Sequence, residues 1–223
     1  MVSPNVPLVL ASASPARLST LVTAGVTPYV LVSDVDEDSV VAHAVTQYGE
    51  LTPEDVVLVL ARAKCEAVAD RLSGESCPED APIGAVVLGC DSVLELDGEL
   101  HGKPVDEAEA TARWQRMRGS SGVLHTGHWL IDDREDSEGG TGATMGAVAS
   151  TTVHFAKVSD QEIAAYVATG EPLRVAGGFT IDGLGGPFIA GLEGDHHNVV
   201  GISLPLLREM LGEINVSWSQ LRS

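Results

Sequence analysis

The sequence has few positive charges. Lys and Arg number 13 against 32 Asp and Glu, so the formal net charge is −19. A surface this acidic repels nucleic-acid backbones and anionic membranes at long range, which argues against nucleic acid or a membrane as a partner. Only three of the basic residues are lysines: Lys64, Lys103 and Lys157. An anionic substrate would need cations gathered locally against this field, so the position of each lysine is informative.

Cysteine is also scarce. Cys65, Cys77 and Cys90 are separated by 12 and 13 positions, and they form no CxxC pair and no Cys/His cluster with zinc spacing. We therefore expect reduced thiols in a cytoplasmic protein.

The sequence has no long hydrophobic run, and a leader segment is not expected. The N-terminus has no basic region ahead of its early prolines, so a signal peptide is not expected. The uncharged run between Arg17 and Asp34 is short and contains Pro28, which is too little to cross a membrane.

The pattern of apolar residues and turn signals predicts a mixed α/β fold. The chain has 223 residues, 44% of them hydrophobic, which suits a single domain over residues 1–223 with a full core. Strands are predicted at 7–12, 29–32, 83–90, 123–131 and 147–158, and Asp97-Gly98 predicts a hairpin turn. Helices are predicted to begin at Ser14-Pro15, Thr52-Pro53, Asp106, Ser159 and about Leu204. Strands alternating with helices and hairpins indicate a mixed twisted sheet with flanking helices.

The segment ASASPAR, residues 11–17, combines a strand end with a helix start. Backbone N–H groups and the dipole of a helix N-terminus favour an anion there. Ser12 and Ser14 add hydroxyl groups, and the Arg17 guanidinium can bind a phosphate through two hydrogen bonds. The alternative is an ordinary helix cap with a surface arginine.

Lys64 is predicted on the inward face of its helix. It follows Leu60 by four residues and precedes Val68 by four, and both are core positions on that face. A lysine there is unfavourable unless its ammonium group meets an anion or reaches solvent past the edge of the apolar stripe.

Two carboxylates, Glu37 and Asp91, follow predicted strands. Because open α/β sheets bind ligands at the carboxyl ends of their strands, we expect Asp91 at the end of the strand 83–90 and near a ligand. Carboxylates together with phosphate oxygens form the hard oxygen environment that Mg²⁺ or Mn²⁺ prefers. A strand-ending aspartate that caps a turn is the alternative.

Two further motifs contain potential binding residues. In HGKPVD, residues 101–106, a glycine and a proline place Lys103 in a rigid loop after the hairpin. The pair His196-His197 suggests a metal site, but adjacent side chains point in different directions on most backbones, so we do not expect these two to share an ion.

Six stretches together resemble the Maf family of nucleoside triphosphate pyrophosphatases. They are LASASPAR (10–17), SDVDE (33–37), LARAKCEAVA (60–69), VLGCDSVLELDGELHGKPVD (87–106), YVATGEP (166–172) and EGDHHNVVGISLPLL (193–207). The resemblance runs in order over residues 8–211, and the combination is specific although each piece alone is weak.

The resemblance implies a house-cleaning enzyme that cleaves non-canonical or surplus nucleoside triphosphates to monophosphate and pyrophosphate. It implies a Maf/ITPase-like mixed sheet in two lobes around a nucleotide cleft, commonly in a homodimer. A non-enzymatic nucleotide-binding regulator associated with cell division is the alternative. No motif in its proper context supports a phosphatase or a sugar-nucleotide transferase.

Carried over residue by residue, the resemblance implies two sets of site residues. The catalytic set is Asp91, as proton acceptor, with Glu37, Lys64 and Lys103. The substrate-binding set is Ser12, Ser14, Arg17, Ser92 and Asp182. Glu37 and Asp91 are the implied ligands of a divalent cation, Mg²⁺ or Mn²⁺.

The chain departs from the family pattern at three positions. Ala16 stands where the family has an arginine, Ser92 follows the aspartate where the family has threonine, and Asp182 replaces a glutamine. These positions differ between family subgroups that prefer dTTP and UTP or N7-methyl-GTP, so the preferred base does not follow from the resemblance.

The departures at Asp182 and Ala16 predict relaxed base specificity. An ionised Asp182 only accepts hydrogen bonds, so it can pair with an N–H of uracil, thymine or guanine, and Ala16 leaves a roomier entrance. We expect kcat/KM for the best and third-best nucleotides to lie within about 30-fold, or ~2 kcal/mol. A panel of dTTP, UTP, CTP and modified GTP measures this, and Asp182→Gln should change the order without abolishing hydrolysis. A preference of ~10⁴-fold for one nucleotide would contradict relaxed specificity.

Overall fold

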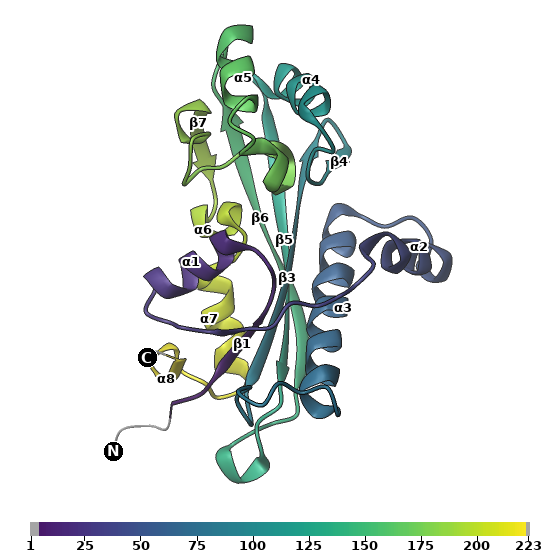
Figure 1. Cartoon of the computed structure of the whole chain (residues 1–223), viewed down its shortest axis with the longest axis vertical. Helices are drawn as coiled ribbons and strands as arrows, with labels where there is room; N and C mark the ends of the chain where they lie inside the picture. Colours follow the sequence, from purple (N-terminus) through teal and green to yellow (C-terminus); the bar gives the residue numbers. More distant parts are fainter. Residues whose placement is uncertain (1–4, 222–223) are drawn as a thin grey trace. The chain divides into compact units, whose positions relative to one another are not determined.

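A sheet of seven strands organises residues 5–221, the part of the chain that the computed structural model describes (Figure 1). Its order is β2-β1-β3-β5-β6-β7, and β4 pairs with β3 outside this path. The strands are β1 (Leu8–Ala11), β2 (Tyr29–Val30), β3 (Val86–Leu96), β4 (Glu99–His101), β5 (Ser121–Asp132), β6 (Thr144–Phe155) and β7 (Ile189–Glu193). β1 is parallel to β2 and β3, whereas β3–β4 and β6–β7 are antiparallel.

The α-helices connect and flank these strands. They are α1 (Pro15–Thr23), α2 (Glu37–Tyr48), α3 (Pro53–Ser73), α4 (Glu107–Met117), α5 (Asp160–Val167), α6 (His196–Val200), α7 (Leu204–Glu213) and α8 (Trp218–Leu221). The expected mixed α/β sheet with flanking helices is confirmed. None of the helices in this described part is long and apolar enough to cross a membrane.

The predicted helix starts are confirmed in detail. Ser14, Thr52, Asp106 and Ser159 are N-caps whose side chains accept a backbone N–H of the first turn. At α3 and α5 the side chain of the third helical residue also accepts a hydrogen bond from the backbone N–H of the N-cap residue. Both helices therefore begin with a complete capping box.

One helix was not predicted. The acidic run after β2 is the N-terminus of α2, with Asp36 as N-cap and Glu37 as the first helical residue. This helix has little signal in the sequence because α2 buries only Ala44 and therefore lacks a clear apolar stripe. Glu37 therefore follows β2 in the chain as expected, but as the first residue of a helix that was not predicted.

The predicted end of the strand at 83–90, which corresponds to β3, is also wrong. β3 does not stop at Asp91 but continues to Leu96. The reason is the hairpin, in which Leu94, Glu95 and Leu96 pair with the short strand β4 across the predicted Asp97-Gly98 turn. The parallel neighbour β1 does end here, since its last pair joins Ala11 to Gly89. Asp91 thus lies two residues beyond the end of β1, inside a longer strand.

The chain contacts divide into two compact units. The first contains the chain up to Asp91, Gly127–Val148 and the segment from Leu204; the second contains Ser92–Thr126 and Ala149–Ser203.

In the first unit, α3 packs very closely on the sheet. Val9, Val87, Cys65 and Val68 belong to one buried apolar cluster between them. The close approach depends on Gly89, where a Cβ atom would lie 2.3 Å from the carbonyl oxygen of Ala61. Only glycine leaves room for this helix backbone.

In the second unit, Trp114 occupies the centre of the core. It is 1% exposed and makes edge-to-face contacts with Phe155, Tyr166 and Phe188. Its indole N–H donates to the carbonyl oxygen of Gly178 at 2.9 Å, so the polar end of the ring is satisfied. Trp114 is therefore a packing residue of this core.

The close approach of α3 to the sheet can be tested by the same substitution, glycine to alanine, made separately at two positions. Gly89→Ala should lower the free energy of unfolding by at least about 2 kcal/mol, because helix and strand must move apart. Gly212→Ala is the matched control, since a Cβ at this exposed position of α7 meets nothing within 4 Å. It should raise the free energy of unfolding by about 0.5–1 kcal/mol. Urea denaturation measures both, and equal effects would contradict the close approach.

Candidate functional site

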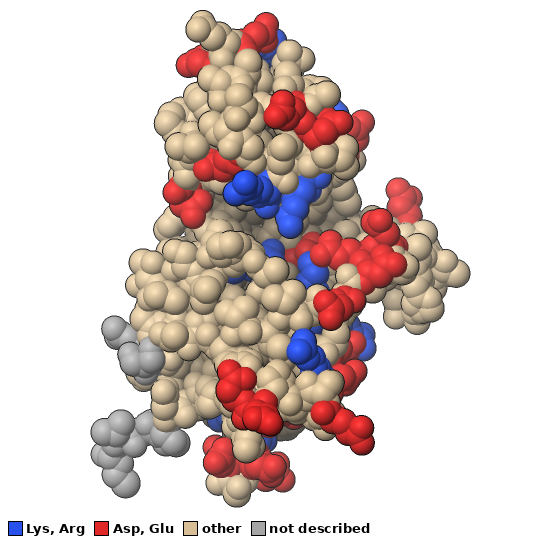
Figure 2. Space-filling view, in the orientation of Figure 1, with Lys and Arg blue, Asp and Glu red and all other residues tan. Residues whose placement is uncertain are grey.

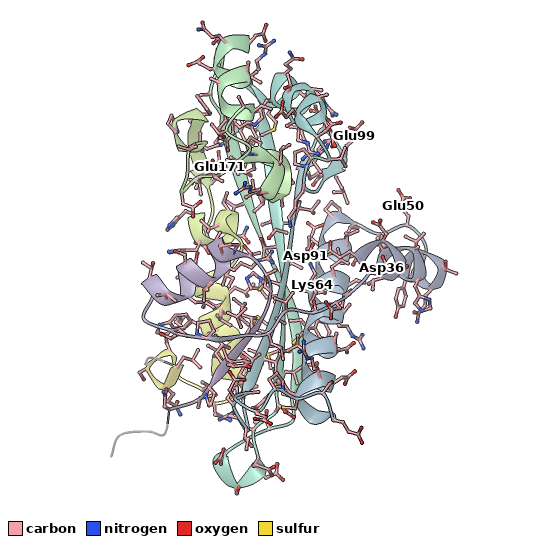
Figure 3. The ribbon with its side chains drawn as sticks, viewed as in Figure 1. Asp36, Glu50, Lys64, Asp91, Glu99 and Glu171 are labelled. Carbon is pink, nitrogen blue, oxygen red and sulfur yellow. The ribbon has the colours of Figure 1, made fainter. Side chains whose placement is uncertain are left out.

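Lys64 lies between two carboxylates in the first unit. Its Nζ is 2.7 Å from Oε1 of Glu37 and 2.5 Å from Oδ1 of Asp91. These contacts join α3, the start of α2 and the middle of β3, and Figure 3 shows the Lys64 and Asp91 side chains next to each other. The anion that the position of Lys64 required is therefore supplied by Asp91 and Glu37.

Burial makes this ion pair electrostatically strong. The side chains of Lys64 and Asp91 are 12% and 14% exposed, whereas Glu37 is 54% exposed. Leu60 and Val68, one turn to either side of Lys64, are buried, as the helical spacing predicted. A buried charge is stable only when paired, so removing either partner leaves an uncompensated charge.

Burial also sets the protonation behaviour of Asp91. Loss of solvation raises the pKa of this carboxyl above its ordinary value, and the nearby charge of Glu37 adds to the effect. Lys64 and Arg17 oppose the shift because they stabilise the carboxylate. A carboxylate with a raised pKa binds a proton more readily, which suits a general base.

Glu37 is positioned by the N-cap of α2. Asp36 accepts hydrogen bonds from the backbone N–H and the hydroxyl of Ser39, and these bonds hold its pKa below the ordinary value. Sequence reasoning missed this capping role, although aspartate is a favoured N-cap residue. Acidic side chains crowd the surface around α2 (Figure 2).

The turn from β1 into α1 brings the predicted phosphate-binding residues together. Nη1 of Arg17 donates to Oγ of Ser12 at 3.0 Å and to the carbonyl oxygen of Cys90 at 2.9 Å. The backbone N–H of Ser14 donates to Ser12 Oγ, and that of Arg17 to Ser14 Oγ, at the long distances of 3.3 and 3.4 Å. Such weak internal bonds can be exchanged for bonds to phosphate oxygens. The contact with Cys90 places Arg17 beside Asp91.

The other predicted site residues belong to the second unit. Oγ of Ser92 forms a 2.9 Å hydrogen bond with Oγ1 of Thr126. Lys103 and Asp182 are exposed on loops. The loop of Lys103 is held by the carbonyl oxygen of Gly102, which accepts from Arg113 at 2.6 Å and from the Gly177 N–H at 3.0 Å.

Sequence reasoning missed Glu171, which organises the loop that carries Asp182. Its carboxylate accepts hydrogen bonds from the hydroxyls of Tyr166 and Thr180 and from the N–H groups of Leu184 and Gly185. Burial works against the ionised form, but these bonds together hold the pKa of Glu171 below its ordinary value. Glu171 lies within the stretch YVATGEP (166–172), but no local spacing predicts its role because its partners lie up to 14 positions away.

The cysteines behave as core and loop thiols. Cys65 and Cys90 are buried and Cys77 is exposed, and all three are free. Burial raises the pKa of Cys90 to about 12, so this thiol beside Asp91 is not a nucleophile.

The carboxylates also fit a divalent cation. Lys64 contacts Oε1 of Glu37 and Oδ1 of Asp91, so Oε2 and Oδ2 remain as oxygen ligands. Two carboxylate oxygens are fewer than a closed metal cage needs. They match Mg²⁺, which commonly uses one or two carboxylates together with water and substrate phosphates.

The effect of Lys64, which lowers the pKa of Asp91 against the effect of burial, can be tested. In metal-free protein, Lys64→Met should raise the pKa of Asp91 further, measured by NMR titration of its side-chain carboxyl. A raised folded-state pKa gives stability that is present at low pH and lost as pH rises through that pKa. Between the pKa of Asp91 in the unfolded chain and its pKa in the folded protein, the free energy of unfolding should therefore fall more steeply in Lys64→Met than in the original protein. Arg62→Met, at an exposed position of the same helix, should leave the titration unchanged. An unaltered Asp91 pKa in Lys64→Met would contradict the coupling.

Comparison with known proteins identifies the family. The family model described as Maf-like protein matches residues 7–214. A protein of Salinispora tropica is 56% identical over 209 residues, covering 94% of this chain and 84% of its own. Proteins of Leifsonia xyli and Streptomyces avermitilis are 50% and 51% identical, covering 96% of this chain and 95% and 93% of theirs. All three relatives are named nucleoside triphosphate pyrophosphatase. The chain therefore belongs to the Maf-like protein family.

Proposed function

We propose that this chain is a nucleoside triphosphate pyrophosphatase, which hydrolyses its substrate at the α-phosphate to nucleoside monophosphate and pyrophosphate. The name shared by relatives at 50–56% identity supports the activity. The observation that carries the mechanism is Lys64 held between Asp91 and Glu37, beside the turn of Ser12 and Arg17. House-cleaning of non-canonical or surplus nucleotides is the role proposed for the reaction.

Asp91 acts as the general base. Its Oδ1 is held by Lys64, and Oδ2 has a second lone pair, beside the one that would face the cation, with which it accepts a proton from the attacking water. Burial raises its pKa, so the carboxylate takes up the proton more readily than an exposed aspartate does. Lys64 fixes the direction of the carboxylate and favours its ionised form.

The cations stabilise the negative charge that develops on the leaving pyrophosphate. Arg17 is held by Ser12 and the Cys90 carbonyl, so its guanidinium is positioned before substrate arrives. The serine hydroxyls and the first-turn N–H groups of α1 are the proposed phosphate contacts. Lys103, Ser92 and Asp182 are proposed as further substrate contacts on the strength of the family resemblance.

Glu37 and Asp91 would hold the divalent cation, Mg²⁺ or Mn²⁺. When bound, the ion supplies charge neutralisation and orientation of the phosphate oxygens. The cytoplasmic location and the homodimer are likewise proposals that rest on the resemblance and on the sequence.

The role of Asp91 is tested by Asp91→Asn. The variant should bind nucleotide yet lose turnover by at least ~10²-fold, because an amide cannot accept the proton. Pyrophosphate release measures the reaction, and nucleotide binding is followed by calorimetry. Asp70→Asn, the same change at an exposed position of α3, should turn over like the original protein.

Removal and return of the metal separate the proposal from the non-enzymatic alternative. EDTA should stop pyrophosphate release and Mg²⁺ or Mn²⁺ should restore it. Unchanged turnover in Asp91→Asn would remove this residue from the mechanism. Nucleotide binding without metal-dependent release by the original protein would favour the regulator, which the names of the relatives do not support.

A further inference from the structure

The start of α6 brings together three side chains that are good metal ligands. One potential ligand atom from each of Asp195, His196 and His197 lies within 4.8 Å of the others. We propose that these residues form a second metal site, which binds a divalent transition-metal ion such as Zn²⁺. All three lie in the second unit, whereas Glu37 and Asp91 belong to the first.

The two imidazole rings lie on the same side of the chain. Their centroids are 3.8 Å apart with an angle of 43° between the ring planes. The expectation that adjacent histidines point in different directions is therefore wrong here. The reason is local, because the chain enters the short helix α6 at His196 with Asp195 as its N-cap.

Asp195 has an oxygen that nothing in the described chain satisfies. Its Oδ1 accepts the backbone N–H of His197 at 3.0 Å and lies 3.3 Å from Nδ1 of the same residue. Its Oδ2 is buried, and residues 5–221 offer it no hydrogen-bond partner. Buried carboxylate oxygens without a donor are uncommon, and a bound cation would satisfy this one.

The backbone that carries these ligands is anchored to two strands. Oγ1 of Thr151, on β6, donates to the carbonyl oxygen of Asp195 at 2.9 Å. The fully buried Asn198 donates to the carbonyl oxygen of Leu124, on β5, and to Thr151, both at 3.1 Å. Ligands on a backbone fixed in this way lose little freedom when an ion binds.

The ligand chemistry selects the kind of ion. Two imidazoles and one carboxylate suit Zn²⁺, Ni²⁺ or Cu²⁺ better than Mg²⁺, with water in the open position. Ligand atoms around a tetrahedral zinc lie about 3.4 Å apart, given bonds of about 2.0–2.1 Å. The cluster must therefore close slightly, which rotation of the exposed His196 ring allows. The net charge of −19 further favours cation binding.

Zinc titration of the full chain by calorimetry tests the site, with excess Mg²⁺ present to occupy sites made of oxygen ligands alone. We expect one Zn²⁺ per chain with micromolar or tighter affinity. The double variant His196→Ala/His197→Ala should lose at least about a hundredfold in this affinity, because even loss of a residue that only supports a ligand costs 10–100-fold. His43→Ala, at an exposed position of α2, is the matched control and should bind like the original protein.

A further variant guards against a folding defect in the double variant. His196→Gln changes only the exposed ring and keeps the Asp195 cap, so it should fold normally and still lose at least about tenfold in zinc affinity. Equal zinc binding by the original protein and both variants would overturn the proposal, as would the lack of any zinc binding by the original protein.

Discussion

The candidate site depends on a lysine buried on the core face of a helix. An ammonium group so placed has lost most of its water, and it is tolerated because Glu37 and Asp91 each contribute a carboxylate oxygen. This requirement fixes the position of three separate parts of the chain. The middle of β3, the start of α2 and the face of α3 must meet at Lys64 if the charge is to be compensated.

Several features of the fold serve this meeting point. Gly89 lets the backbone of α3 approach β3 two residues before Asp91, and Asp36 fixes the first turn of α2 and with it Glu37. β1 ends at Ala11, which pairs with Gly89. The turn that carries Ser12 and Arg17 therefore lies next to the part of β3 that contains Asp91. Packing, capping and strand length thus all act on the same few side chains.

The sequence predicted those parts of this arrangement that are local. Caps followed by proline marked α1 and α3, the Asp97-Gly98 turn marked the hairpin, and helical spacing placed Lys64 on the inner face. What it could not predict depends on partners distant in the chain. The continuation of β3 through Asp91 depends on pairing with β4, and the role of Glu171 depends on a loop that it holds by hydrogen bonds. The side-by-side rings of His196 and His197 follow from the start of a helix too short to leave a periodic signal.

The division of the chain into two units has a consequence for how the protein folds. The first unit combines the segment before Ser92 with Gly127–Val148 and the segment from Leu204, and a backbone hydrogen bond joins Val6 to Gln220 at 2.8 Å. Its contacts therefore close very long loops, which slows folding. During synthesis this unit stays incomplete until the residues beyond Leu204 leave the ribosome. The second unit ends at Ser203, so all of its residues leave the ribosome earlier. The apolar residues that pack against Leu207, Met210 and Leu211 of α7 stay uncovered during that interval, when a chaperone would be most useful.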